Sequence, residues 1–307
     1  MSSSNHEPRS RLDELATEAW NADGADLDLR STLELVELMN AADAGVPAAV
    51  AGAAEAVANA VDAIAVRLQG GGRLIYVGAG TSGRLAALDA TECESTFSTR
   101  PGQVTALIAG GAASSPVEQE AAEDDAVAGE RELDALGVSA ADAVVGVTAS
   151  GRTPYVLGAI RRARAVGAVT AGIVSVHESE LAGLVEHEIV VVVGPEIIAG
   201  STRLKAGTAQ KLVLNMLSTL SMVRIGKTFG NLMVDVYATN EKLRARVRRV
   251  VGHATGATPD AVEHALAESG GDAKVAIVSL LSDTDAATAR ERLGRADGLI
   301  RRAVEPR

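Results

Sequence analysis

The sequence predicts an α/β protein, in which a parallel sheet is covered by helices on both faces and a smaller helical region follows. Helical stretches separate most of the five short apolar runs that we expect to be strands: Arg73–Gly78, Val104–Ala109, Ala143–Thr148, Val169–Val176 and Glu188–Val193. Because each run is apolar almost throughout rather than alternating, both faces of its strand should be buried. The predicted architecture is therefore a three-layer sandwich around a five-stranded parallel sheet.

Helical patterns surround and separate these strands. Leu29, Leu33 and Val36 share one helical stripe, and the Ala/Val-rich stretch from Ala48 to Leu68 predicts a largely buried helix. Further predicted helices span Pro116–Leu136, Pro154–Val166, Gly200–Arg224 and Asn231–Gly252, and three short helical units follow Thr255. The patterns divide the chain into an N-terminal helical segment (1–47), an α/β domain (48–230) and a C-terminal helical domain (231–307).

Composition narrows the class of function. The formal net charge of −11 disfavours nucleic-acid binding, which rewards a basic surface. No apolar run approaches the about 20 residues that a membrane-spanning helix needs, and the polar start Met1–Pro8 lacks the apolar stretch of a signal peptide. The single cysteine, Cys93, excludes an internal disulfide and suits a reducing compartment. We therefore expect a cytoplasmic protein with neither a membrane nor a nucleic-acid partner.

Two glycine- and hydroxyl-rich turns are the most informative feature of the chain. Gly78–Arg84 follows the first predicted strand, and Ala149–Pro154 follows the third. Each turn leads into a helix, whose first backbone N–H groups and partial positive charge favour an anion. Ligands of such sheets bind at the carboxyl ends of the strands. The two turns together predict a site for a small phosphorylated molecule, with these candidate ligands: Gly80, Thr81, Ser82, Ser150, Gly151, Arg152 and Thr153.

The first turn also matches the dinucleotide-binding pattern G-x-G-x-x-G, which suggests a nicotinamide oxidoreductase as an alternative. That pattern should continue with an acidic residue about 20 positions later, but the chain has no Asp or Glu between Glu94 and Glu118. Hydroxyl groups and the Arg84 guanidinium clustered on one turn favour a phosphate monoester instead. Ser82 also suits a helix cap, and one side chain can serve both purposes.

A third polar stretch, Gly200–Lys211, opens the long predicted helix. It is rich in hydroxyl groups for a solvated helix start, so we expect Ser201, Thr202 and Lys205 to form a third wall of the site. Candidate acids occur in Asp89–Glu94 and in the charged run Glu118–Asp125, and spacing alone does not choose among them. No histidine pair has the i, i+4 spacing of a zinc-binding helix, so we expect no metal site.

Several motifs together resemble the N-acetylmuramic acid 6-phosphate etherase family. They are Val77–Leu85, Leu88–Cys93, Ala149–Tyr155, Gly200–Lys211, and Asn231–Asp235 followed by Ala238–Asn240. The resemblance runs from about Thr17 to the end of the chain. It implies a sugar isomerase-type α/β domain with a C-terminal helical extension, a homodimer, and no cofactor or metal. The implied reaction converts N-acetylmuramic acid 6-phosphate to N-acetylglucosamine 6-phosphate and D-lactate by cleaving the lactyl ether.

The resemblance also implies roles for individual residues. Glu92, in Asp89–Cys93, takes the position of the family's proton donor, and Glu123, in Ala122–Asp124, that of its second carboxylate. Ser82, Ser150 and Thr153 match the hydroxyl groups that hold phosphate in this kind of domain. The chain departs from the family where Glu94-Ser95 replaces Pro-Pro and where Trp20–Gly24 replaces Arg-Asn-Pro-x-Thr.

These positions suggest a mechanism of elimination followed by addition of water. The open-chain aldehyde acidifies the proton on C2, Glu123 removes it as general base, and Glu92 protonates the departing ether oxygen. Water then adds with Glu92 as the base. Two carboxyl groups that start in opposite protonation states suit such a sequence. The alternative from another class is a non-catalytic sugar-phosphate sensor on the same fold, which needs the hydroxyl turns but not both acids.

Overall fold

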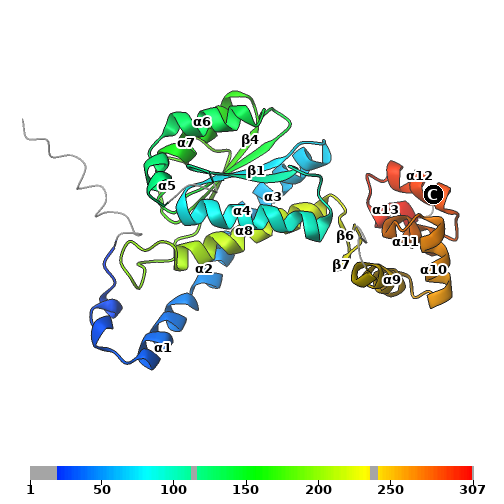
Figure 1. Ribbon diagram of the computed structural model, residues 1–307, viewed down its shortest axis with the longest axis horizontal. Coiled ribbons are helices and arrows are strands. Elements are labelled where there is room, and N and C mark those ends of the chain that lie inside the picture. Colours follow the sequence, from blue (N-terminus) through cyan, green and yellow to red (C-terminus); the bar gives the residue numbers. More distant parts are fainter. Residues whose placement is uncertain (1–18, 112–115, 236–240, 306–307) are drawn as a thin grey trace, which may run out of the picture. The chain divides into compact units, whose positions relative to one another are not determined.

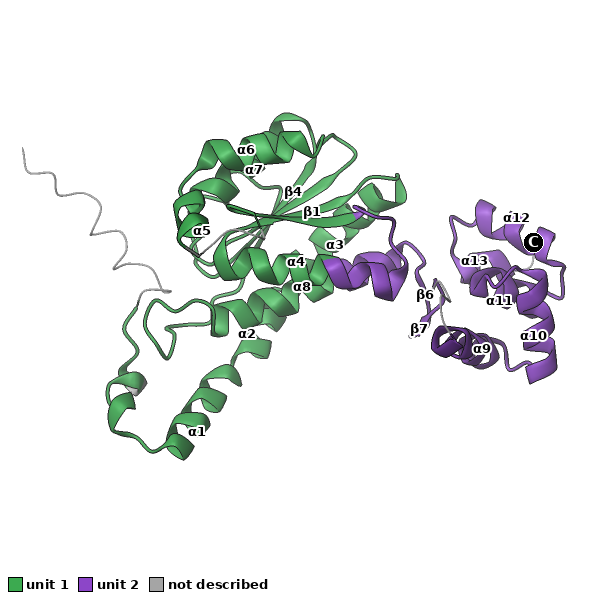
Figure 2. Cartoon of the chain, in the orientation of Figure 1, with its two compact units in different colours: residues 1–90, 104–217 green, residues 91–103, 218–307 purple. Residues whose placement is uncertain are grey.

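The computed structural model describes residues 19–111, 116–235 and 241–305, and it separates into two compact units. The first comprises Met1–Ala90 and Val104–Leu217, and the second Thr91–Gln103 and Ser218–Arg307 (Figure 2). The predicted start Met1–Pro8 and the motif residues Ala238–Asn240 lie outside the described residues.

The first unit contains the predicted five-stranded sheet. Its strands are β1 (Leu74–Gly78), β2 (Val104–Ile108), β3 (Ala143–Val147), β4 (Val169–Val174) and β5 (His187–Val190). They are all parallel and lie in the order β2-β1-β3-β4-β5. Gly78 pairs in register with Ile108 and Val147, so β1 and β3 end side by side. The turns that follow these two strands therefore leave the sheet at the same edge, next to one another.

Helices cover both faces of this sheet. α5 (Pro116–Glu123), α6 (Ala126–Ala135) and α7 (Pro154–Ala165) lie on one face, and α3 (Ala54–Gln69), α4 (Gly80–Phe97) and α8 (Lys205–Arg224) on the other (Figure 1). All five residues of β1 and of β3 are buried, as expected for strands covered on both sides. The fold is the predicted α/β sandwich.

The N-terminal part of the first unit begins with two 3₁₀ turns, η1 (Ala22–Gly24) and η2 (Leu27–Leu29), followed by α1 (Thr32–Asp43) and α2 (Val46–Gly52). A capping box, in which Ser31 accepts from the Glu34 N–H and Glu34 from the Ser31 N–H, starts α1. No residue of α1 is buried. Its apolar side chains are at most partly covered within the described chain, and Leu33 and Val36 are 66% and 59% exposed.

The second unit has a small helical core of its own. Its helices are α9 (Glu241–Thr255), α10 (Pro259–Glu268), α11 (Ala273–Ser282), α12 (Ala286–Arg295) and α13 (Ile300–Val304). Side chains of all five helices form one buried cluster, with Ile277 and Val251 at its centre. Asp side chains cap α11 and α12, as expected from Asp272 and Asp285 before each helix.

Some predicted boundaries were wrong. The single helix predicted over Pro116–Leu136 is interrupted after Glu123, because the Asp125 side chain accepts from the Ala128 N–H and starts α6 as a separate helix. The helix predicted over Asn231–Gly252 is wrong at its start, where Leu232–Met233 form β7 and pair with β6 (Thr228–Phe229) in a short antiparallel hairpin; the helix itself is α9 (Glu241–Thr255). Gly230 makes this turn with a positive φ of 58°. After Thr255 there are four helices rather than three.

None of the described helices is by itself long and apolar enough to cross a membrane. One bent pair, Thr32–Gly52 with Ala54–Gln69, has that length and composition only when its two parts are counted together.

Candidate functional site

The first turn joins β1 directly to α4, and its glycines make the close approach possible. A side chain on Gly78 would place its Cβ 2.7 Å from the backbone nitrogen of Gly83, and Gly80 has a φ of +50°. The turn presents the half-buried side chains of Thr81 and Ser82 at the start of α4. The Arg84 guanidinium donates to Thr81 Oγ1 at 3.3 Å, so the hydroxyl and basic groups of this turn are close together, as predicted.

The second turn joins β3 to α7 through a chain of hydroxyl groups. Thr148 Oγ1 lies 2.8 Å from Thr153 Oγ1 and 3.4 Å from Ser150 Oγ. Gly151 has a φ of +67°, and a Cβ there would lie 2.3 Å from the Cβ of Ser179. Arg152 N–H donates to Ser150 Oγ at 3.3 Å, which fixes the turn locally.

Glu123 is in contact with this second turn. It is the last residue of α5, half-buried, and its Oε1 accepts from the Thr153 hydroxyl at 3.2 Å. Thr153 has only one hydroxyl proton, so the 2.8 Å contact is donated by Thr148. The structure thus places Glu123 at the edge of the sheet where β1 and β3 end. Its neighbours Asp124 and Asp125 are exposed.

Glu92 is not brought to the turns within one chain. It is exposed on α4, twelve residues after Gly80. At 1.5 Å per residue it lies about 18 Å along the helix axis from the start of α4. The buried acid of the same motif is Asp89, which accepts from the Tyr76 hydroxyl at 3.0 Å and from Asn215 Nδ2 at 2.6 Å. Asp89 therefore holds β1 and α8 against α4.

The third polar stretch contributes differently from the prediction. α8 begins at Lys205 rather than at Gly200, because both carboxylate oxygens of the buried Glu196 accept from the N–H groups of Lys205 and Ala206 at 3.0 Å. Glu196 therefore already occupies the N-terminus of α8. Lys205 Nζ donates to the Val193 carbonyl at 2.7 Å, which ties the segment after β5 to this helix.

The half-buried Ser201 and Thr202 lie in the turn before α8. Gly207 N–H donates to the Thr202 carbonyl, and a Cβ on Gly207 would lie 3.7 Å from the Thr81 side chain. The start of α8 thus packs beside the first turn. Ser82 Oγ donates to Gln210 Oε1 at 2.9 Å across the same contact.

Sequence reasoning did not assign Thr148 or Glu196 to the site, and it included Gln210 only as one of the polar residues of Gly200–Lys211. Thr148 is the last residue of a predicted strand, where a hydroxyl in an otherwise apolar run is a usable signal. Glu196 lies nine residues before Lys205, which is farther than the two or three residues between an ordinary N-cap and the N–H that it accepts from. Its role depends on a loop that brings residues nine positions apart together.

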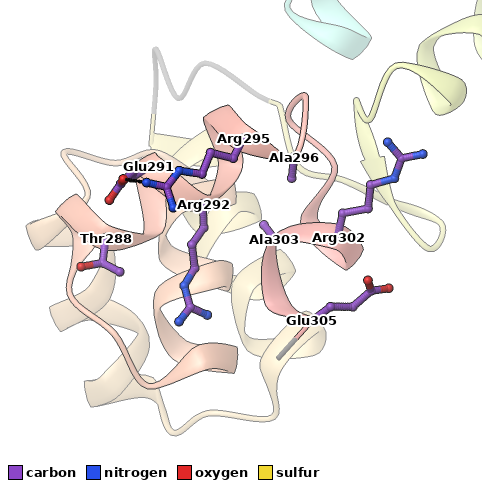
Figure 3. A pocket seen from close by; sticks show the side chains of 8 residues that line it. All are labelled: Thr288, Glu291, Arg292, Arg295, Ala296, Arg302, Ala303 and Glu305. Carbon is purple, nitrogen blue, oxygen red and sulfur yellow. Dashed lines mark hydrogen bonds and ion pairs between the residues drawn. The ribbon is translucent and has the colours of Figure 1, made fainter. Parts of the chain in front are cut away.

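A separate cavity of about 440 Å³ lies in the C-terminal unit, between α12 and α13. Its charged lining does not converge on one point: Arg295 pairs with Glu291, and Arg292 and Arg302 point in different directions (Figure 3). It holds none of the predicted site residues. In the described part of the chain, no group of three or more His, Cys, Asp or Glu side chains is arranged to hold a metal ion.

Comparison with known proteins identifies close relatives along almost the whole chain. The chain is 55% identical over 306 residues to the N-acetylmuramic acid 6-phosphate etherase of Streptomyces coelicolor, which covers 99% of this chain and 98% of that protein. It is 57% identical to the protein of the same name from Rubrobacter xylanophilus, covering 96% and 97%. The family described as glucokinase regulatory protein N-terminal SIS domain matches residues 56–164.

Among solved structures, the chain resembles a phosphoheptose isomerase from Francisella tularensis. The TM-score is 0.49 at 19% identity, and the match covers 63% of this chain and all of the other.

Proposed function

The chain belongs to the N-acetylmuramic acid 6-phosphate etherase family, a family of carbon–oxygen lyases, and we propose that its two hydroxyl-rich turns bind the phosphate while Glu123 and Glu92 carry the chemistry. The near-complete likeness to curated etherases is the observation that carries the activity. The substrate is accordingly a phosphorylated amino sugar, N-acetylmuramic acid 6-phosphate. The roles of Glu92 and Glu123 come from the motif resemblance, and the contacts of the described residues support the binding site.

The phosphate is proposed to lie between the turns after β1 and β3. These turns leave the sheet at one edge, and each leads into a helix start whose backbone N–H groups favour an anion. Ser82, Ser150 and Thr153 place hydroxyl groups at that edge, although in the structure the protons of Ser82 and Thr153 are directed to Gln210 and Glu123. A local site of this kind is needed because the chain as a whole carries a formal charge of −11, which repels a phosphate dianion.

Glu123 is proposed as the general base at C2. The Thr153 hydroxyl donates to its carboxylate, and Thr148 donates in turn to Thr153. Only the Thr153 proton points at the carboxylate, and Thr148 holds Thr153 in that orientation, so the carboxylate is positioned to act as a base. Its place beside the second turn puts it within reach of a sugar held there by its phosphate.

Glu92 is proposed as the acid that protonates the departing lactyl oxygen at C3 and afterwards activates the water that adds there. In one chain, about 18 Å of helix separates it from the start of α4, which is more than a hexose 6-phosphate spans. We therefore assign Glu92 to the site of a second copy. Leu88, one helical turn before Glu92, is 55% exposed, so this face of α4 carries the apolar surface that an interface between copies buries.

A homodimer is proposed on a second observation. Leu33, Val36 and Met39 line α1 at helical spacing, and all are more than 40% exposed in the single chain. Exposed apolar stripes of this kind mark interaction sites. Together with the exposed position of Glu92, they favour two copies that complete one another's sites. The single buried cysteine, Cys93, is consistent with a cytoplasmic enzyme.

Lactate release from N-acetylmuramic acid 6-phosphate tests the function directly. The purified protein should release one D-lactate for each N-acetylglucosamine 6-phosphate formed. A non-catalytic sugar-phosphate sensor would bind the substrate in a calorimeter and release none. Release of lactate from the unphosphorylated sugar with equal efficiency would contradict the proposed phosphate site but not the lyase activity.

A further inference from the structure

A buried amide beside the first turn has a polar atom that the chain does not use. Gln210, on α8, is only 2% exposed. Its Oε1 accepts from the Ser82 hydroxyl at 2.9 Å, whereas its Nε2 has no hydrogen-bond partner among the described residues. Buried polar side-chain atoms are paired in most proteins, so an unpaired donor needs an explanation, such as a ligand or bound water that completes it.

The position of Gln210 points to the phosphate as that ligand. The residue that it contacts, Ser82, lies in the first turn of α4, and Gly207, one turn earlier on α8, packs beside Thr81. The amide therefore lies at the edge where the backbone N–H groups at the start of α4 also favour an anion. A phosphate dianion only accepts hydrogen bonds, and the unpaired Nε2 of Gln210 is a donor.

The orientation of the amide in the structure is the one that suits a phosphate. As it stands, Nε2 is the atom that would donate to a phosphoryl oxygen. After a half-turn, Nε2 would donate to Ser82 Oγ, but the Oε1 acceptor would then take its place and repel the anion. A methionine at 210 supplies no donor of its own.

We propose that Gln210 is a substrate-binding residue of the phosphate site, which orients Ser82 and supplies an amide donor for the phosphoryl group of the sugar. This proposal rests on the proposed binding of phosphate at the first turn. It adds a ligand from α8 to the hydroxyl groups of the two turns, and so makes the discrimination between phosphorylated and unphosphorylated sugar depend on a third element.

Two variants separate a binding role from a packing role. Gln210→Met keeps the length of the side chain and loses both polar atoms. Gln210→Glu keeps an acceptor for Ser82 but replaces the donor with a negative charge. We expect KM for N-acetylmuramic acid 6-phosphate to rise about 10-fold in the first and about 100-fold in the second, the range of a hydrogen bond to a charged group. The kcat for lactate release should change much less.

The pH dependence of the Gln210→Glu variant gives a readout that packing alone does not move. At low pH the introduced carboxyl group is protonated, becomes neutral and regains a donor. The ratio of its KM to that of the unsubstituted protein should therefore fall as the pH is lowered, and this ratio cancels the titration of the substrate itself. The ratio for Gln210→Met should stay constant with pH.

Matched variants keep the outcomes distinct. Thr208→Val, on the exposed side of α8, removes a hydroxyl that donates to the carbonyl of Leu204, the residue just before the helix, and should leave KM unchanged. Ser82→Ala tests the phosphate site itself. If Ser82→Ala raises KM but both Gln210 variants bind substrate normally, the role of Gln210 is refuted and the site stands. If Ser82→Ala has no effect on KM, the proposed site has failed.

A loss of folding is recognised separately. Thermal unfolding is measured on each variant, and the product N-acetylglucosamine 6-phosphate serves as the calorimetric probe of binding. A folded Gln210→Met variant that binds this product with the affinity of the unsubstituted protein would overturn the proposal. If only one of the two variants folds, that variant decides the matter.

Discussion

The two edges of the sheet carry polar clusters of opposite kinds. At the amino edge, Asp142 is 2% exposed and accepts from Arg73 Nη2 at 2.8 Å, from Arg73 Nε at 3.1 Å and from two backbone N–H groups. Arg73 also donates to the carbonyls of Leu136 and Gly137. At the carboxyl edge, Gln210 Nε2 and Arg152 Nε are buried without partners in the described chain.

The difference separates polar groups that stabilise the fold from polar groups that the fold leaves unpaired. The closed cluster at the amino edge has its donors and acceptors matched to one another, so it stabilises the join between β1 and the loop before β3. The open cluster at the carboxyl edge leaves two buried donors unpaired, at a cost to stability, and we propose that an anionic ligand completes them. Substitutions at the two edges should therefore have separable effects.

The largest effect is expected from the two proposed acids, Glu123 at the open edge and Glu92 on α4. Glu92→Gln should lower lactate release by about 10²–10⁴-fold, the usual contribution of a positioned acid or base. It should leave the exchange of the C2 proton with heavy water intact, because removal of that proton needs only the base. Glu123→Gln should lose both activities. Proton NMR in heavy water follows the exchange, and equal loss of both activities in Glu92→Gln would reassign the roles.

The next largest effect is expected at the closed edge. Asp142→Asn leaves the half-buried guanidinium of Arg73, whose side chain is 28% exposed, without its carboxylate and should lower the free energy of unfolding by about 2 kcal/mol. The KM at 25 °C should not change. Urea unfolding measures the difference. Asp134→Asn removes an ion pair with Arg162 whose side chains are 46% and 33% exposed, and it is the matched control, with a loss below about 1 kcal/mol.

Ser82→Ala should affect KM rather than stability, the opposite of Asp142→Asn. It removes a phosphate donor, so KM should rise about 10-fold, while the free energy of unfolding should change by less than about 1 kcal/mol. Steady-state kinetics and urea unfolding on the same preparation check both. A stability loss as large as that of Asp142→Asn would show that the carboxyl edge is as closed as the amino edge.

The smallest expected effect is a dependence on pH. Burial alone would raise the pKa of Asp142, but the hydrogen bonds from Arg73 and the Ser139 N–H outweigh it and lower the pKa below the ordinary value. A lowered folded-state pKa means that the stabilisation is complete above the unfolded pKa of about 3.9 and is lost as the pH falls through the folded value.

The unfolding free energies of the unsubstituted protein and of Asp142→Asn should accordingly differ most at neutral pH and converge below about pH 4. Urea titrations at several pH values test this convergence. A gap that stays constant down to pH 2 would show that the Asp142 charge makes no contribution.

The sequence was enough to predict the sheet, because each buried strand reads as an apolar run and each turn after β1 and β3 carries glycines that the close backbone approach requires. It was not enough for the start of α8. There the cap is Glu196, nine residues before Lys205, and no local pattern reveals it. The interruption between α5 and α6 was missed because Asp125 lies within a charged run that also reads as helix surface.

The site was predictable in composition but not in arrangement. Hydroxyl groups at strand ends predict that the two turns meet, and the structure brings Glu123 to the second turn as a hydrogen-bond acceptor of Thr153. The position of Glu92 depends on what lies against α4, which a single chain does not specify. Gln210 was visible as one polar residue among several in its helix, and only its burial and its unpaired nitrogen distinguish it.

Complementation between two inactive variants tests most directly whether the open edge is completed by a second copy. Glu92→Gln and Glu123→Gln are purified separately, mixed in equal amounts, unfolded and refolded together, and assayed for lactate release. If Glu92 acts in the partner's site, each mixed dimer contains one intact pair of acids, and random pairing restores about a quarter of the normal activity. A mixture of folded dimers that remains as inactive as its components would contradict the account.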